Sequence, residues 1–331
     1  MSTAKLVTVY GATGLQGGSV VRSLLANKNH EFSVRGITRN PGSEKSKALS
    51  TLGVEMVKAD GKNLHQIREA FQGSWAVFLN TDTEDPDLNK PNGPTESDFG
   101  KALVDVAAEV GVQVLVYSGM RSAAEATHGL VPVRVYDQKA IIAEYARTKG
   151  FKSAISVSAA WYLDNHLSEA MAPLFGGFPF IPDDEGYLTF RLPYLGGDGT
   201  MSWIDLESDY GDIVHATLLE PEKYNGQQIE AISCIARLED LVTMFERVTK
   251  KKSRYVGFDW KAVEVDGNLE ADTVKGIFGM THHIDASFRQ RFYDPTQAKA
   301  LKAKAAVARG VSGAAAELAT LEGFISKHFA S

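Results

Sequence analysis

The sequence predicts an α/β fold: a doubly wound parallel sheet followed by a smaller, mostly helical or irregular C-terminal lobe. The chain opens with an apolar strand, residues 6–10, that runs into a glycine-rich turn. Apolar runs of strand length then alternate with segments of helical periodicity as far as residue 158, the pattern of right-handed βαβ units, and past it the alternation fails. We therefore expect one domain over residues 1–160, with a return of the chain around residues 201–235, and a cleft-forming lobe over residues 161–331.

The glycine-rich turn, Gly11-Ala12-Thr13-Gly14-Leu15-Gln16-Gly17, is the most specific pattern in the chain. In such a turn the first glycine permits a tight bend, the second lets backbone N–H groups approach a pyrophosphate, and the third lets helix and strand pack closely. The helix that follows then points its N-terminus at the phosphates. The sequence predicts a Rossmann-type dinucleotide site, and the alternative interpretation is an ordinary strand-to-helix turn.

The end of the second expected strand indicates which dinucleotide is bound. An NAD site usually places Asp or Glu about 20 residues past the glycines, where it binds a ribose hydroxyl. This chain has Thr38 followed by Arg39 instead, with Lys45 close behind. Because a guanidinium can grip a phosphate with two charge-assisted hydrogen bonds, the pattern favours NADP. The alternative is that Arg39 is a solvated surface residue.

Further elements of the first domain follow from apolar runs and helical periodicity. Residues 81–97 are polar and broken by prolines, so we expect a mobile connection that acts as a lid, forms a partner contact or is only surface slack. A helix over residues 103–110 follows it. We expect strands over residues 32–38, 54–60, 75–80, 112–117 and 154–158, and a helix over residues 135–147.

The second half of the chain has a different composition. Residues 171–200 are rich in proline, glycine and aromatic residues, which is typical of an irregular cap around a pocket or of the core of a small lobe. Residues 203–214 indicate a return to the first domain and a helix, and residues 228–233 a short strand. We expect the remainder to be mostly helical, with its last two helices separated at residues 310–313.

Composition excludes several classes of function. The 331 residues carry a net charge of −6, which disfavours a nucleic-acid partner because phosphate backbones are bound by basic patches. Cys234 is the only cysteine, so no intrachain disulfide can form and a cytoplasmic location is expected. No apolar run reaches the length of a membrane-spanning helix, and the first strand begins too close to Met1 for a secretory signal.

Other charged motifs predict structure rather than chemistry. The basic run at residues 250–254 follows a helical pattern and is interpreted as a solvated helix end. His282 and His283 lack a zinc-site spacing, and residues 183–185 lack the spaced ligands of a calcium loop, so no metal is expected. Neither a nucleophile elbow nor a Walker lysine is present.

With these residues in place, the chain resembles the NmrA-like family of atypical short-chain dehydrogenases over nearly its whole length. The motifs that carry the resemblance are the glycine turn, residues 38–41, Asn80-Thr81, Tyr117-Ser118, Lys139, residues 161–165 and residues 203–205. The resemblance implies a Rossmann-type domain that binds NADP(H) and a smaller lobe that completes a cleft. It places Arg39 at the adenosine phosphate, Asp60 near the adenine, Asn80, Thr81 and Lys139 near the ribose and nicotinamide, and Tyr162 with Asn165 on the cleft wall.

The proton donor of active short-chain reductases is missing at its usual place. A tyrosine four residues before the lysine donates the proton in those enzymes, and here that residue is Val135. Tyr136 is three residues away, about 100° around the helix from the usual position. Tyr136, Tyr162 or Lys139 itself would have to substitute, and the isoflavone-reductase-like relatives do use a lysine.

The sequence favours the first of two functions and leaves the second open as the alternative. The first is an NADP(H) sensor or regulator that a partner protein recognises, suggested by an intact cofactor motif beside a degenerate reductase site. The second is an NADPH-dependent oxidoreductase that acts on a small aromatic or apolar carbonyl or enone, with Lys139 as the catalytic residue and Ser118 beside it. In both, a small molecule or a partner protein occupies the cleft. A DNA-binding regulator is disfavoured by the net charge.

Overall fold

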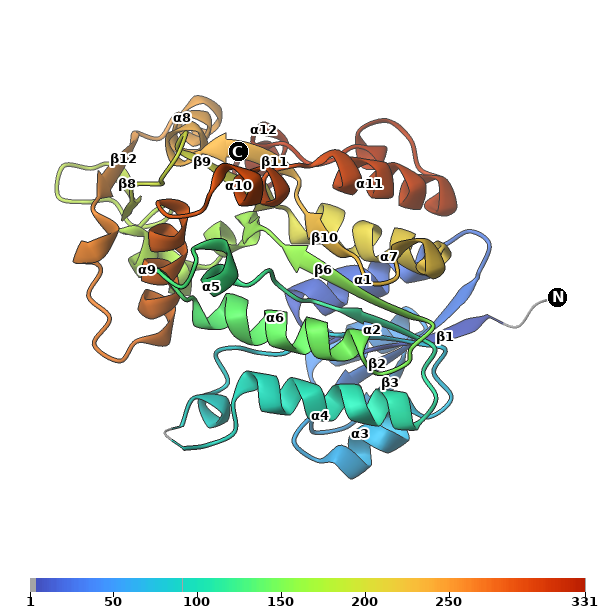
Figure 1. Cartoon of the computed structure of the whole chain (residues 1–331). Coiled ribbons are helices and arrows are strands. Elements are labelled where there is room, and N and C mark those ends of the chain that lie inside the picture. Colours follow the sequence, from blue (N-terminus) through green and yellow to red (C-terminus); the bar gives the residue numbers. More distant parts are fainter. Residues whose placement is uncertain (1–3, 91, 331) are drawn as a thin grey trace.

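The computed structural model describes residues 4–90 and 92–330, and its centre is a seven-stranded sheet in which every neighbouring pair is parallel (Figure 1). The strand order reverses between β4 and β1, which is where open α/β sheets bind their ligands. In spatial order the strands are β10 (Gln228–Ala231), β6 (Ser153–Ala159), β5 (Val114–Tyr117), β4 (Ala76–Leu79), β1 (Lys5–Val9), β2 (Phe32–Thr38) and β3 (Glu55–Lys58).

Helices cover both faces of this sheet, and each face has its own apolar core (Figure 1). Central strands such as β4 are consequently buried along their whole length, as a sheet covered on both sides requires. One face is covered by α1 (Leu15–Leu25), α2 (Glu44–Thr51), α7 (Gly211–Leu219) and α11 (Thr296–Arg309). The other is covered by α3 (Leu64–Phe71), α4 (Glu96–Glu109) and α6 (Arg134–Arg147).

A second assembly lies beyond the carboxyl edge of the sheet and has a separate core of aromatic and aliphatic side chains. Its strands form a three-stranded sheet, β11 (Cys234–Arg237), β9 (Thr200–Ile204) and β7 (Trp161–Tyr162), and a parallel pair, β12 (Ser253–Phe258) and β8 (Leu188–Pro193). Its helices are α8 (Leu238–Thr249), α9 (Leu269–Thr281), α10 (Ala286–Phe292) and α12 (Leu321–Phe329).

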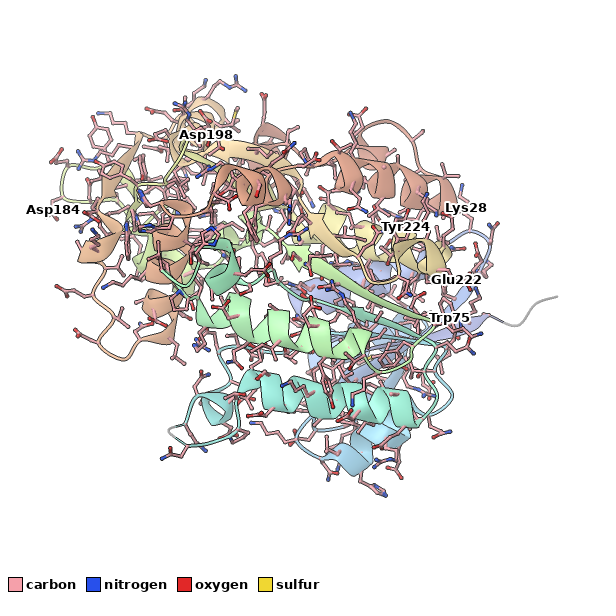
Figure 2. All side chains as sticks on the ribbon, viewed as in Figure 1. Lys28, Trp75, Asp184, Asp198, Glu222 and Tyr224 are labelled. Atoms are coloured by element: carbon pink, nitrogen blue, oxygen red, sulfur yellow. The ribbon has the colours of Figure 1, made fainter. Side chains whose placement is uncertain are left out.

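Short helical turns complete the chain between these elements. They are α5 (Ala123–Ala126), η1 (Pro86–Asn89), η2 (Leu163–Leu167), η3 (Glu169–Phe175), η4 (Leu206–Tyr210), η5 (Pro221–Tyr224), η6 (Trp260–Ala262) and η7 (Gly313–Ala316). Figure 2 shows Asp184 and Asp198 at the opposite end of the molecule from Lys28 and Trp75. No helix among the described residues is long and apolar enough to cross a bilayer.

The structure confirms the expected fold class and shifts several boundaries. Helix α4 begins at Glu96, inside the connection predicted over residues 81–97, because Thr95 and Asp98 form a capping box. Pro91 of that connection lies outside the described residues. The stretch 171–200 is less irregular than predicted, since it contains β8, which pairs with β12 far along the chain.

The predicted return of the chain around residues 201–235 stays a prediction. Strand β9, which lies within it, belongs to the small sheet. From there η4 and α7 lead back to β10 at the sheet edge. The division of the chain at residue 160 stays a prediction.

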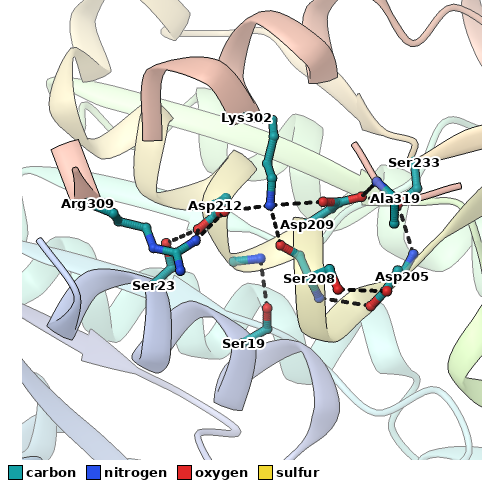
Figure 3. A network of polar contacts seen from close by, with 11 residues as sticks. Ser19, Ser23, Asp205, Ser208, Asp209, Asp212, Ser233, Lys302, Arg309 and Ala319 are labelled. Atoms are coloured by element: carbon teal, nitrogen blue, oxygen red, sulfur yellow. Dashed lines mark hydrogen bonds and ion pairs between the residues drawn. The ribbon is translucent and has the colours of Figure 1, made fainter. Parts of the chain in front are cut away.

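The C-terminal part of the chain is fastened to the back of α1 by a buried polar network (Figure 3). At its centre the ammonium of Lys302 donates to the Ser208 carbonyl at 2.6 Å and to Asp212 at 2.8 Å, and it lies 3.0 Å from Asp209. Asp212 also accepts from Ser23 on α1 and from Arg309 at the end of α11. The network holds α1, α7 and α11 together.

Candidate functional site

A cavity of about 880 Å³ runs along the carboxyl ends of the parallel strands. It is lined by residues that follow β1, β2, β4, β5 and β6 and by the facing side of α6, η3 and α9. All of the residues assigned to cofactor binding from the sequence, except Leu15, line it: Gly11, Thr13, Gly14, Gln16, Arg39, Asp60, Asn80, Thr81, Lys139, Tyr162 and Asn165. The side chain of Leu15 is 55% exposed and is not among the lining residues that the structure describes.

The glycine turn forms one wall of the cavity. Gly11 has a φ of +76°, which an L-residue adopts only with strain. A Cβ on Gly17 would lie 2.2 Å from the Gly11 carbonyl oxygen, so only glycine lets α1 approach the turn this closely. Gly14 is the N-cap of α1 and offers no side-chain cap, and the first backbone N–H groups of a helix have no intrahelical partner. The turn therefore leaves bare amides at the cavity for an anion.

Positive charge lies at the end of the cavity beside β2. Arg39 and Lys45 line it there, together with Asn40 and Ser43. Arg39 is exposed, and within residues 4–90 and 92–330 it has no ion pair. By contrast Lys62, on the neighbouring loop, is bound by Asp85 and Asp87. Among the described residues Lys45 is likewise exposed and without an ion pair, so Arg39 and Lys45 are both open to a ligand at this end.

Asp60 and Tyr10 border the same end. The Asp60 carboxylate accepts a hydrogen bond from the backbone N–H of Lys62 at 3.0 Å, which fixes the loop after β3. Burial, with the charge of Asp60 as a secondary cause, raises the pKa of the Tyr10 hydroxyl to about 12. Tyr10 packs so closely on Gly61 that a Cβ there would lie 2.0 Å from its hydroxyl oxygen. The neutral Tyr10 phenol and the loop that contains Asp60 therefore border this end of the cavity.

Lys139 is 7% exposed, so it is a buried residue and not a solvent-exposed lysine on the helix surface. Its ammonium donates to the Thr81 carbonyl at 2.7 Å, to the Thr81 hydroxyl at 3.1 Å and to Glu96 at 2.7 Å. Glu96 also accepts from the hydroxyls of Thr81 and Thr83. Tyr117 shares the Thr81 hydroxyl at 2.8 Å, and burial raises its pKa well above the usual value.

Glu96 is the residue that the sequence argument missed. It is 3% exposed and lies in the first turn of α4, 43 residues before its partner lysine. The Thr95-x-x-Asp98 capping signature predicts that a helix starts here, but not that the first carboxylate turns inward. An ion pair between residues 43 positions apart produces no local sequence pattern from which it could be predicted.

Two tyrosines, Tyr136 and Tyr162, also line the cavity. The Gln16 amide donates to the Tyr162 hydroxyl at 2.6 Å, and burial raises the pKa of Tyr162 to about 12. Burial also raises the pKa of Tyr136. Although Tyr136 is rotated away from the usual donor position on α6, it lines the same cavity as Lys139 and Val135. Both phenols are protonated at neutral pH and can donate.

The far end of the cavity is mostly apolar. It is contributed by the segment after β6, by η3 and by α9, elements of the second assembly. The apolar side chains there are Trp161, Met171, Leu174, Phe175, Val274 and Ile277, and α9 also contributes Glu270 and Thr273. One cavity thus joins a cationic end, a glycine turn, two neutral hydroxyls and an apolar end, which is an arrangement suited to an anionic dinucleotide beside a small apolar molecule.

The fold and the position of the cavity define the chain as an α/β protein of the Rossmann type. The NmrA-like family model matches residues 3–324, so the chain belongs to the NmrA-like family. It is 42% identical to the NmrA-like family domain-containing oxidoreductase FrzB of Cladobotryum sp, with 98% of each chain covered.

Solved structures share the fold at lower identity. NmrA, a negative transcriptional regulator crystallised with NADP, matches with a TM-score of 0.73 and 21% identity over 94% of this chain and 96% of that one. The triphenylmethane reductase of Citrobacter sp., crystallised with NADP(H), matches with a TM-score of 0.69 and 17% identity over 97% and 99% of the two chains. At these identities the likeness establishes the fold alone.

Proposed function

We propose that this chain is an NADP(H)-dependent oxidoreductase that reduces a small apolar or aromatic carbonyl or enone. The observation that carries the proposal is the continuity of the cavity, which runs from Arg39 past the glycine turn to two protonated phenols and an apolar end. The full-length relative named an oxidoreductase supports it. A cofactor and a substrate would lie side by side in such a space.

The choice of NADP rests on this chain's own residues. NmrA has been crystallised with NADP and also with NAD, so membership of the family does not decide between them. Here β2 ends in Thr38 and is followed by Arg39, so the position at which NAD sites usually carry an acidic residue has none. Arg39 and Lys45 at this end favour the phosphorylated cofactor.

The residues of the cavity fit the cofactor and have defined tasks. Bound NADPH supplies a hydride. The bare amides at the start of α1 bind the diphosphate, and the apolar side chains at the far end exclude water from the substrate. Tyr136 is the donor we propose for a substrate oxygen, because its phenol is held protonated and it lies on the same helix as Lys139. Tyr162 already accepts from Gln16 and is assigned to the cofactor side.

The experiment is a turnover assay with pure protein, NADPH and a panel of small carbonyls and enones, followed by the loss of NADPH absorbance. We expect Tyr136→Phe to lower kcat by about 10²–10⁴-fold while leaving NADPH affinity unchanged, since general acids contribute that much. Tyr162→Phe is the matched phenol and should mainly weaken NADPH binding. Undiminished turnover in Tyr136→Phe would remove Tyr136 from this role.

A redox-cofactor sensor is the second candidate function. The observation in its favour is Val135, which occupies the position of the usual proton donor and cannot transfer a proton. A sensor binds NADP(H) and changes conformation, but it turns over no substrate. Tight NADPH binding, a cofactor-dependent change in limited proteolysis and no turnover with any carbonyl of the panel would favour the sensor over the oxidoreductase.

A further inference from the structure

The three bonds made by the Lys139 ammonium are unequal. The bonds to Glu96 and to the Thr81 carbonyl are each 2.7 Å, whereas the bond to the Thr81 hydroxyl is 3.1 Å. That hydroxyl oxygen is shared, since the Tyr117 hydroxyl also lies 2.8 Å from it. The N–H of Lys139 that donates to the Thr81 hydroxyl is therefore the one that can turn to another acceptor with the smallest loss of hydrogen-bond energy.

Glu96 stands behind Lys139 and not at the cavity. Lys139, Thr81 and Thr83 line the cavity, while Glu96 is not among the lining residues that the structure describes. The side chain of Glu96 is 2% exposed, and both of its oxygens are occupied, one by Lys139 and Thr81 and the other by Thr83 at 2.9 Å. Glu96 can therefore affect a ligand only through Lys139, Thr81 and Thr83, and Lys139 is the cation among them.

The position of Lys139 identifies which part of the cofactor it can meet. In a Rossmann-type sheet the diphosphate lies at the start of the first helix, so the two halves of the dinucleotide extend to opposite sides of the β1–β4 reversal. Arg39 follows β2 on one side and Thr81 follows β4 on the other. Lys139, bound to Thr81, therefore faces the half that does not carry the adenosine, and the acceptors nearest the diphosphate there are ribose hydroxyls.

We propose that Glu96 is a positioning residue for cofactor binding, an inference that rests on the proposed function. Together with the Thr81 carbonyl it fixes two of the three N–H groups of Lys139. The remaining N–H is aimed at the cavity, where a ribose hydroxyl on the nicotinamide side replaces the shared Thr81 hydroxyl. A buried carboxylate on α4 thus sets the orientation of a cationic donor on α6.

The test compares two ligands by isothermal titration calorimetry. NADPH reaches from Arg39 to Lys139, whereas adenosine 2′-phosphate 5′-diphosphate occupies only the Arg39 end and the glycine turn. We expect Glu96→Gln, which keeps the shape of the side chain and removes its charge, to weaken NADPH about tenfold, as losing one charge-assisted hydrogen bond does. The affinity for the fragment should stay unchanged.

A double-mutant cycle with Lys139→Met isolates the route of the effect. In the Lys139→Met background Glu96→Gln should cause no further loss of NADPH affinity, because the group through which it acts is gone. Unchanged NADPH affinity in Glu96→Gln, an equal loss for both ligands, or fully additive losses would overturn the inference.

Two further results keep the test decisive. If Glu96→Gln does not fold, Thr83→Val removes one hydrogen bond from the same carboxylate. It should weaken NADPH about threefold without affecting the fragment, and equal losses would again overturn the inference. If the unmodified protein binds neither ligand, both the inference and the proposed function fail. If it binds both ligands and the variant loses affinity equally for the two, only the inference fails and the proposed function stands.

Discussion

Lys139 and Lys302 are two buried lysines in nearly the same local setting. They are 7% and 3% exposed, and each ammonium has carboxylate and carbonyl partners. Lys139 lies on α6 beside Glu96, and Lys302 lies on α11 between Asp209 and Asp212. Burial and pairing alone would give the two residues the same role.

What separates them is position relative to the sheet. The partners of Lys302 come from η4 and α7, and the network lies behind α1, where it lines a smaller cavity of about 360 Å³ (Figure 3). Lys139 lies at the carboxyl edge of the parallel strands, where it lines the large cavity together with Arg39 and the glycine turn. The comparison teaches that burial and pairing do not separate the two lysines, whereas position at the edge where the fold binds ligands makes Lys139 the candidate for the cofactor site.

The largest expected effect is on stability and comes from a substitution that breaks the polar network behind α1. Lys302→Met removes the cation between Asp209 and Asp212 and leaves Asp209 without an ion pair among the described residues, while Asp212 keeps Arg309, so we expect the free energy of unfolding to fall by about 3–5 kcal/mol. NADPH affinity of the folded variant should be unchanged. Chemical denaturation and calorimetry measure the two quantities.

Lys304→Met is the matched control for this substitution. It lies on the same helix, but its partner Glu220 is on the surface, and such pairs contribute little. An unfolding free energy for Lys302→Met as high as that of Lys304→Met would contradict a structural role for the network.

The next effect concerns pH and the same region. His215 accepts from the Asn27 amide and lies beside Ser23, and burial lowers its pKa to about 4. In the unfolded chain the His215 imidazole takes up a proton near pH 6.5, whereas in the folded chain it stays neutral until about pH 4. The free energy of unfolding therefore falls by about 3 kcal/mol as the pH is lowered from 6.5 towards 4. Denaturation curves measured across that range should show the loss, and it should be smaller in His215→Asn. An equal loss in that variant would assign it to other groups.

The third effect concerns the cavity and should leave stability unchanged. Arg39→Ala removes an exposed cation with no ion pair among the described residues, so we expect unfolding to be unaffected. NADPH affinity should fall by about 1.5–3 kcal/mol, the contribution of hydrogen bonds to a charged group, and NADH affinity should change little. Lys47→Ala, an exposed cation on α2 paired with Glu44, should change neither. Equal losses for the two cofactors would contradict a 2′-phosphate contact.

The parallel sheet was predictable from the sequence because strands covered on both faces are continuous apolar runs. Ala76–Leu79 and Val114–Tyr117 are buried at every position and lie within the predicted runs. The small sheets were not predictable in this way. Strand β7 has two residues and pairs with β9, 42 positions later, and β8 pairs with β12, 65 positions later, so neither leaves a local periodicity.

The same distinction applies to the site. Gly11, Gly14, Arg39 and Lys139 belong to local motifs, and the structure brings them to one cavity. The partner of Lys139 depends on a contact across 43 residues, and the Lys302–Asp212 pair spans 90. Sequence motifs identify groups that face a ligand, whereas the groups that orient them depend on tertiary packing.

The central claim is that the cavity at the carboxyl edge binds NADP(H) through bare amides and Arg39. Titration of the unmodified protein with NADPH and with NADH, followed by calorimetry, tests it most directly. We expect one NADPH per chain, bound more tightly than NADH. No saturable binding of NADPH, or tighter binding of NADH, would contradict the account.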